Sequence, residues 1–236
     1  MNSETLKSLN RARAAGRAVV RATDIATGED RLIDPYMDHS PLGLVAAQAA
    51  RADRSGPAEI DGRNWFLAVY NPPLDLVVIG AVHIAQPLAR IATLAGYGVR
   101  VIDPRTAFAT EERFPGVTLI HEWADEALAQ NPLGPRSALV ALTHDPKLDD
   151  PALVVALNSS CFYIGALGSK KSHAARLMRL KQQGFDDRQL ARIHGPVGLD
   201  IAAKSPAEIA VSIVAEMTKE LRAGDGWERP IARATA

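Results

Sequence analysis

A chain of 236 residues can bury one sizeable hydrophobic core, or can form one α/β domain with a small companion. Its 27 Lys and Arg residues balance 27 Asp and Glu residues, and this zero net charge argues against a non-specific nucleic-acid binder or a membrane-surface protein. No apolar run approaches the roughly 18 residues of a membrane span, and the polar start lacks the apolar centre of a signal peptide. We therefore expect a cytoplasmic protein without a membrane span.

The first 71 residues predict a small α+β segment. Its apolar patterns indicate, in chain order, a helix, a strand, a second helix and a second strand, at residues 5–16, 17–23, 41–56 and 64–70. Asn71–Pro73 then interrupts the chain, because adjacent prolines cannot continue a helix or a central strand. We place a domain boundary there.

From residue 72 to about residue 223, short apolar runs alternate with helical patterns. This alternation predicts an α/β domain, a Rossmann-like parallel sheet with helices on both faces. Strands are expected at residues 74–80, 99–103, 117–120, 137–143 and 161–167, and helices at residues 83–98, 149–159 and 205–221. The second helix is predicted to open with an Asp cap and Pro151, and the third with a capping box formed by Ser205 and Glu208. The Gly-rich residues 224–236 show no pattern and predict a loose tail.

Ligands of such sheets bind beyond the carboxyl ends of the strands, so the loops that follow the strands are the candidate site. The first of them resembles a dinucleotide-binding fingerprint, with Gly80 and Ala85 at its first and third positions and Val82 where a second glycine belongs. Asp103 ends the next strand, 23 residues after Gly80, near the spacing of an acid that binds a ribose hydroxyl. The simpler alternative is that Asp103 only caps its turn. The side chain of Val82 occupies the space of a pyrophosphate, so we do not expect the standard NAD pose.

A pair of lysines marks the loop after the last predicted strand. In the segment Gly168–Ser172, Lys170 and Lys171 stand where a helix should begin. A cation is unfavourable there by about 0.3–1 kcal/mol, and an anion bound between the lysines and the free N–H groups would remove this cost. The segment therefore predicts a site for a phosphate or another anionic ligand, unless both side chains simply point into water.

Three histidines, His83, His144 and His194, occur at predicted strand ends or loops, where they could donate hydrogen bonds, move protons or bind a metal. Their spacing matches no metal-binding motif, and we predict no metal site. Hydrolase chemistry is not expected either, because no G-x-S-x-G motif is present. The single cysteine, Cys161, excludes an internal disulfide, and its apolar surroundings predict inert packing.

Five segments together resemble the XdhC/CoxI family, whose members assist the maturation of molybdenum hydroxylases such as xanthine dehydrogenase. In order, they are residues 72–89, 101–115, 142–153, 163–172 and 195–216. The resemblance implies a Rossmann-like domain that binds the molybdenum cofactor, guards its sulfurated form and hands it to an apoenzyme. It makes binding, rather than catalysis, the expected task, and we assign no catalytic residue.

A molybdopterin dinucleotide carries a pyrophosphate, a ribose and an anionic dithiolene, which would suit Gly80, Asp103 and the lysines after Gly168. The candidate cofactor-binding residues, taken from the four loops, are Gly80, His83, Asp103, Arg105, Thr143, His144, Asp145, Gly168, Ser169, Lys170 and Lys171. One alternative is an NAD(P)-dependent oxidoreductase, with Asp103 on the ribose, Arg105 on a 2′-phosphate and His144 as the proton-transfer group. Another is a degenerate Rossmann domain that only docks other proteins.

The chain departs from the family in two places. Family members usually carry Gly-Gly-Cys and Cys-Gly-Gly motifs in an N-terminal domain, and Cys161 lies in neither. The first loop of the family normally reads Gly-Ala-Gly-His, where this chain has Val82. The resemblance therefore implies two partners, a molybdenum hydroxylase apoenzyme and a separate cysteine-bearing protein. A homodimer is the default expectation for the chain itself.

Overall fold

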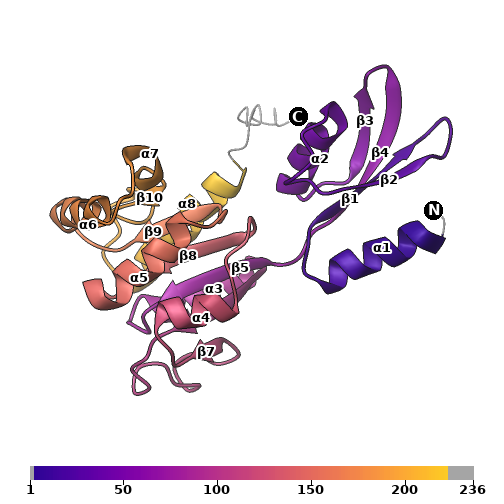
Figure 1. The fold of residues 1–236 in the computed structure, drawn as a ribbon. Helices are drawn as coiled ribbons and strands as arrows, with labels where there is room; N and C mark the ends of the chain where they lie inside the picture. The colour runs from indigo at the N-terminus through magenta and orange to yellow at the C-terminus, as the bar shows by residue number, and fades with distance from the viewer. Residues whose placement is uncertain (1–2, 223–236) are drawn as a thin grey trace, which may run out of the picture. The chain divides into compact units, whose positions relative to one another are not determined.

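The computed structural model describes residues 3–222, which fall into two compact units (Figure 1). One unit comprises the described residues up to Pro72 together with Leu221 and Arg222, and the other is Pro73–Glu220. The tail expected at residues 224–236 lies outside the described residues. Within the described part, no helix has the length and apolar character needed to cross a membrane.

The first unit is an antiparallel sheet of four strands in the order β2-β1-β4-β3. The strands are β1 (Val19–Asp24), β2 (Asp30–Ile33), β3 (Gly56–Ile60) and β4 (Arg63–Tyr70), and the helices are α1 (Ser3–Ala14) and α2 (Pro41–Arg51). Helix α2 buries its small residues Ala46 and Ala50 in a core with Trp65 and Leu67. The sequence patterns had predicted β1, β4 and both helices. They missed β2 and β3, because short edge strands with alternating exposure carry little apolar signal.

The second unit is a parallel sheet of six strands in the order β10-β9-β8-β5-β6-β7. This is the strand order of the doubly wound Rossmann sheet. The strands are β5 (Leu74–Ile79), β6 (Tyr97–Ile102), β7 (Thr118–Ile120), β8 (Ser137–Ala141), β9 (Tyr163–Ala166) and β10 (Ile193–His194). Strands β5 and β8 are buried almost throughout, as strands covered on both faces must be. Strand β10 is only two residues long and escaped prediction for that reason.

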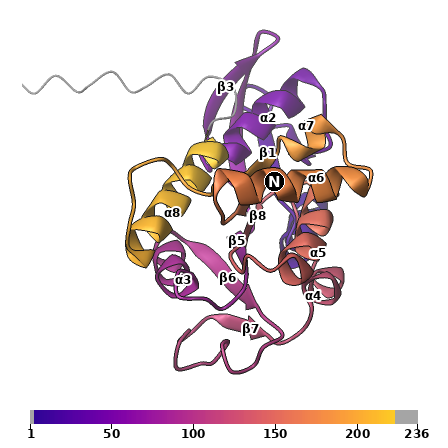
Figure 2. The same ribbon diagram turned by 90° about the vertical axis from the view of Figure 1, so that its left-hand side faces the viewer.

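Helices cover both faces of this sheet, which confirms the predicted fold class. Figure 2 shows α3 and α8 on one side of the strands and α4 and α5 on the other. The helices of this unit are α3 (Ala85–Leu94), α4 (Ala124–Gln130), α5 (Pro146–Leu157), α6 (Lys170–Gln182), α7 (Asp187–Leu190) and α8 (Pro206–Arg222). The capping box of α8 forms as predicted: the Glu208 amide donates to the Ser205 hydroxyl, and the Ser205 amide donates to the Glu208 carboxylate.

The start of α5 differs from the prediction. The helix begins at Pro146 and is capped by Asp145, whose side chain accepts a hydrogen bond from the Lys147 amide at 2.9 Å. Pro151, predicted at the first helical position, lies inside the helix. The chain offers the same Asp-Pro signal twice, and the prediction took the second. The earlier start adds a first turn in which Leu148 and Asp149 are buried.

Candidate functional site

The topology places the loops after β5 and β8 at the switch point of the sheet. Strand β5 lies between β6 and β8, so the chain leaves β5 toward one edge of the sheet and continues from β8 toward the other. The two loops also touch. Gly80 has a φ of +97°, and a Cβ atom at this position would collide with the Cγ2 atom of Thr143. Only glycine fits this turn without strain, because it combines a positive φ with a close approach.

Asp103 directly follows β6, is fully buried, and binds the loop after β5. Its Oδ2 atom accepts a hydrogen bond from the Ala81 amide at 2.8 Å. Arg105 binds the same carboxylate in a bidentate manner, with Nε 2.9 Å from Oδ1 and Nη2 2.8 Å from Oδ2. Burial alone would raise the pKa of Asp103, but the hydrogen bonds from Arg105 and Ala81 outweigh it and lower the pKa. Both oxygens are thus engaged, and a ribose can reach Asp103 only if Arg105 moves.

Arg105 links this loop to the loop after β8. Its guanidinium lies over the ring of Phe108, with 4.6 Å from Cζ to the ring centroid, and 41% of its side chain is exposed. The hydrogen bond to Asp103 raises the pKa of Arg105, and the charges of Asp145 and Asp149 raise it further. Arg105 therefore stands within electrostatic reach of the turn that begins α5.

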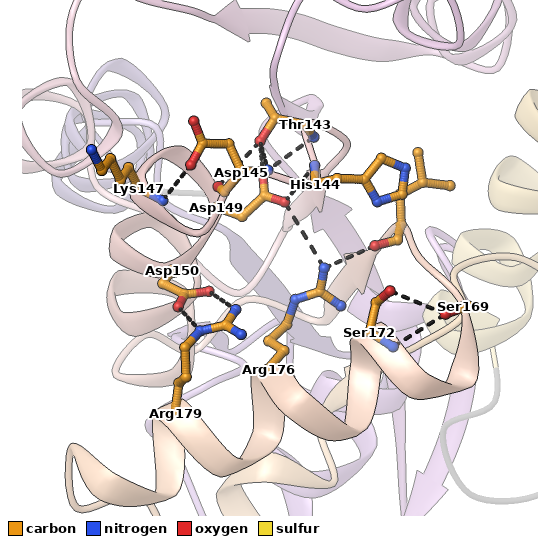
Figure 3. Close-up of polar contacts among 11 residues, drawn as sticks. Thr143, His144, Asp145, Lys147, Asp149, Asp150, Ser169, Ser172, Arg176 and Arg179 are labelled. Atoms are coloured by element: carbon orange, nitrogen blue, oxygen red, sulfur yellow. Dashed lines mark hydrogen bonds and ion pairs between the residues drawn. The ribbon is translucent and has the colours of Figure 1, made fainter.

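The turn after β8 is organised by a residue that the sequence analysis did not single out. Asp149 is buried, and its Oδ1 atom accepts hydrogen bonds from the Thr143 hydroxyl at 2.7 Å and the Thr143 amide at 3.3 Å. Its Oδ2 atom accepts from the His144 amide at 3.1 Å (Figure 3). These bonds hold His144 at a φ of +63°, in the left-handed region that non-glycine residues rarely adopt. Burial outweighs the hydrogen bonds and raises the pKa of Asp149.

A second residue missed by the sequence analysis, Arg176, lies on α6 beneath the loops. Its side chain is 4% exposed, and its Nη2 atom donates to the Leu167 carbonyl at 2.8 Å. The same nitrogen is 3.9 Å from Oδ2 of Asp149, so Arg176 connects the loops after β8 and β9 (Figure 3). Burial lowers the pKa of Arg176. An arginine in mid-helix has no motif around it, and this position could not be selected without the fold.

The loop after β9 leads directly into α6. Gly168 has a φ of +144°, and a Cβ atom there would lie 3.1 Å from Cβ of Ser172. Ser169 caps the helix by accepting a hydrogen bond from the Ser172 amide at 3.1 Å. Lys170 and Lys171 are exposed, and within residues 3–222 neither has an ion-pair partner. The lysines therefore stand at a helix N-terminus without compensation, as the sequence pattern predicted.

The loops after β8 and β9 lie side by side. The Nδ1 atom of His144 is 3.8 Å from the point where a Cβ atom of Gly168 would stand. Asp145 belongs to the same turn as His144, where it caps α5. His83 is exposed in the short turn before α3, whose N-cap residue, Ile84, makes no side-chain capping bond. Val82 is half-buried beside it.

His194 has a different setting from the other two histidines. Its ring stacks on Tyr163 with the centroids 4.7 Å apart, and its Nδ1 atom is 3.4 Å from the Glu216 carboxylate. Tyr163 donates a hydrogen bond to the same carboxylate, and burial raises the pKa of this tyrosine. His194 is thus held in a partly buried polar cluster formed by β9, β10 and α8. Among residues 3–222, no three His, Cys, Asp or Glu side chains gather as a metal site would require.

Cys161 precedes β9 and is buried, as its apolar surroundings predicted. Its Sγ atom contacts the Ala156 carbonyl at 3.6 Å, and burial raises the pKa of the thiol. A buried thiol with a raised pKa forms little thiolate, and the thiolate is the reactive form. This cysteine is therefore a packing residue in the structure.

The six-stranded parallel sheet and its switch-point loops define the protein as a Rossmann-like domain with a small α+β companion. Residues 76–217 match the family described as the XdhC Rossmann domain. The match covers more than half of the chain, and it lies within the six-stranded unit. The chain belongs to this family.

Several curated proteins are similar to parts of this chain. It is 34% identical over 155 residues to a probable xanthine dehydrogenase subunit of Bacillus subtilis, across 65% of this chain and 45% of the relative. It is 29% identical over 154 residues to the molybdenum cofactor insertion chaperone PaoD of Escherichia coli, across 65% of this chain and 42% of that protein. The uncharacterized protein YqeB of Escherichia coli is 29% identical over 185 residues, across 78% of this chain and 33% of that protein. The chain thus spans less than half the length of these curated relatives.

A solved structure is similar over nearly the whole chain. It is a protein of Bacillus halodurans described as a xanthine dehydrogenase, with a TM-score of 0.65 and 25% sequence identity. The similarity covers 93% of this chain and 67% of that one. The small first unit therefore belongs to the shared architecture as well.

Proposed function

We propose that this protein is an accessory factor for the maturation of molybdenum hydroxylases, which binds the molybdenum cofactor as a pterin dinucleotide and hands it to an apoenzyme. The observation that carries the proposal is the match of residues 76–217 to the XdhC Rossmann domain. A relative named as a molybdenum cofactor insertion chaperone, matched over 154 residues, supports the same role.

The residues at the switch point fit a ligand that carries phosphates. Gly80 lets the turn after β5 pack closely against Thr143, and Lys170 and Lys171 offer uncompensated positive charge at the N-terminus of α6. When bound, the pterin dinucleotide would supply the dithiolene that holds molybdenum, and the backbone N–H groups and cations of the chain would hold its nucleotide end. Val82 in the same turn would limit how deeply a pyrophosphate could enter it.

The pairing of Asp103 with Arg105 favours delivery over a nicotinamide-dependent reaction. In an NAD(P) enzyme Asp103 would bind the ribose and Arg105 its 2′-phosphate. Here the two side chains bind each other instead. A carrier needs affinity and release rather than a group tuned for proton transfer. Exposed His144 and His83 then serve as hydrogen-bond donors to the cofactor.

The buried thiol of Cys161 supports a role for partners in this proposal. Because this thiol is buried and its pKa is raised, it forms little of the thiolate that sulfur chemistry requires. The cysteine motifs of the family would then come from a separate protein that acts with this chain, and the receiving partner would be a molybdenum hydroxylase apoenzyme.

The test is cofactor retention followed by transfer. The protein is produced together with the molybdenum-cofactor synthesis enzymes, its bound small molecules are identified by mass spectrometry, and the loaded protein is mixed with a cofactor-free molybdenum hydroxylase. We expect a retained pterin dinucleotide and recovery of hydroxylase activity, both reduced by His144→Ala. A nicotinamide absorbance assay with alcohols, aldehydes and hydroxy acids runs alongside. Steady turnover of any of these substrates, lost in His144→Ala, would replace the delivery function with an oxidoreductase.

A further inference from the structure

Arg176 is a buried cation whose hydrogen-bonding capacity is only partly used. One nitrogen, Nη2, donates to the Leu167 carbonyl and stands 3.9 Å from Asp149, whereas Nε and Nη1 are buried without a hydrogen-bond partner. Unpaired N–H groups of a buried guanidinium are unfavourable, because they have lost water and gained nothing in return. Native proteins keep few such groups, and one that persists points to strain, to a functional role or to an ordered water or ion that pairs with it.

The next arginine along the same helix face shows how a structural arginine is satisfied. Arg179, one turn later on α6, binds Asp150 in a bidentate manner, with Nε 2.6 Å from Oδ2 and Nη2 3.0 Å from Oδ1. Its side chain is 37% exposed, so water reaches its other donor atoms. Arg176 comes from the same helix, but it is only 4% exposed and has no bidentate partner among the described residues.

The guanidinium of Arg176 lies between two polar turns. Figure 3 shows it flanked by the Thr143–Asp149 contacts on one side and by the Ser169–Ser172 contacts on the other, with the His144 ring beside it. The Ser169 and Ser172 hydroxyls are 3.0 Å apart and exposed, and His144 is also exposed. Exposed side chains change rotamer within nanoseconds, so these side chains can reorient toward a ligand without unfolding of the loops.

We propose that Arg176 and the N-terminus of α6 form one anion site, in which a phosphate group of the ligand binds to the guanidinium, the Ser169 and Ser172 hydroxyls and the first amides of the helix. Lys170 and Lys171 attract the anion at the surface, and Arg176 receives it below. This inference rests on the proposed function and adds to it the group that recognises the phosphate end of the cofactor. A planar guanidinium suits this task because its donors match phosphate oxygens in pairs.

The experiment uses inorganic pyrophosphate as the probe and the full-length protein. Calorimetric titration compares the parent protein with Arg176→Met, which keeps the length of the side chain and removes its charge. Arg179→Met is the matched control on the same helix. We expect Arg176→Met to bind pyrophosphate about tenfold to a hundredfold more weakly, since it loses charged hydrogen bonds, and Arg179→Met to bind like the parent. Parent-like affinity in a folded Arg176→Met protein would overturn the proposal.

A measurement on the parent protein covers the case in which Arg176→Met does not fold. The side-chain Nε–H resonance of Arg176, assigned through its backbone, should shift during a pyrophosphate titration while that of Arg179 stays in place. An unmoved Arg176 resonance, or no pyrophosphate binding at all, would refute the anion site. The outcome also separates this inference from the proposed function. If the pterin dinucleotide is retained whether or not Arg176 is present, only the anion site is contradicted. If pyrophosphate binds but no pterin is retained, only the delivery function is contradicted.

Discussion

The carboxylate of Asp103 accepts hydrogen bonds from two different loops, the Ala81 amide after β5 and the Arg105 side chain after β6. Asp103, which the sequence pattern predicts to bind a ribose, therefore also holds these two loops together. Gly80 must be a glycine for two reasons. Its φ is positive, and the nearby methyl group of Thr143 leaves no room for a side chain. At the scale of single residues, contacts with neighbouring loops therefore hold Asp103 and Gly80 of the candidate site in place.

Gly80→Ala should destabilise the protein. The new methyl group meets the Cγ2 atom of Thr143 and the backbone holds a positive φ, so we expect the free energy of unfolding to fall by about 2–4 kcal/mol. Urea denaturation measures this change. Gly134→Ala is the control, since a Cβ atom there meets nothing within 4 Å. Equal stability of the two variants would show that the turn after β5 relaxes easily.

The stability lost in Arg105→Ala should depend on pH. Because the pKa of folded Asp103 lies below its unfolded value, the stability it contributes is fully present above about pH 4 and is lost as the pH falls through the folded pKa. Removing the partly exposed Arg105 should cost about 1 kcal/mol at pH 7 and less at pH 3.

Urea denaturation of the parent and of Arg105→Ala at both pH values checks this expectation, with exposed Arg90→Ala on α3 as the control. An identical loss at pH 7 and pH 3 would mean that Arg105 acts through packing on Phe108 rather than through the carboxylate.

Helix α6 illustrates, at the scale of an element, a conflict between local stability and binding. Its first turn carries Lys170 and Lys171, each opposed by the helix dipole, although Ser169 caps it well. Its last turn carries Lys181, where a cation is favourable and also pairs with Asp187 at 2.7 Å. The positive charge in the last turn therefore stabilises the helix, whereas the two positive charges in the first turn destabilise it. The anion site proposed at the first turn would account for the difference.

Replacing both Lys170 and Lys171 with alanine should weaken pyrophosphate binding several-fold while stability stays the same or rises by ~0.3–1 kcal/mol per lysine. Calorimetric titration and thermal melting measure the two effects. Lys181→Ala should do the reverse, lowering stability slightly and leaving affinity unchanged. A sharp drop in melting temperature with intact affinity in the double variant would make the two lysines structural.

The molecule as a whole divides into two units with separate cores. The match to the XdhC Rossmann domain, residues 76–217, lies within the unit Pro73–Glu220. That unit has all six strands of its sheet and helices on both faces, so its core does not depend on a strand from elsewhere. The first unit buries its own cluster around Trp65 between its sheet and α2.

A protein of residues 73–222 should therefore fold by itself. We expect circular dichroism typical of an α/β protein, dispersed amide resonances and pyrophosphate affinity like that of the full chain. Size-exclusion chromatography of the same sample reports its compactness. Collapsed, poorly dispersed resonances would show that the six-stranded unit requires residues 3–72.

Much of the fold was predictable because its signals are local. The alternation of apolar runs with helical patterns indicated five of the six parallel strands, and Ser205 with Glu208 marked the start of α8. Strands β2, β3 and β10 were missed because they are short edge strands, whose pairing depends on a neighbour already in place. The start of α5 was wrong because two Asp-Pro pairs give the same local signal.

By itself, the sequence determined that a Rossmann-like sheet forms and that Gly80, Asp103, Thr143 and Gly168 follow its strands, since each depends on a pattern within one short segment. Only the tertiary structure decided how these loops are held. The pairing of Asp103 with Arg105, the turn that Asp149 fixes, and the burial of Arg176 depend on distance, exposure and competition for hydrogen bonds. Those quantities arise when segments far apart in the chain pack together, and no local pattern carries them.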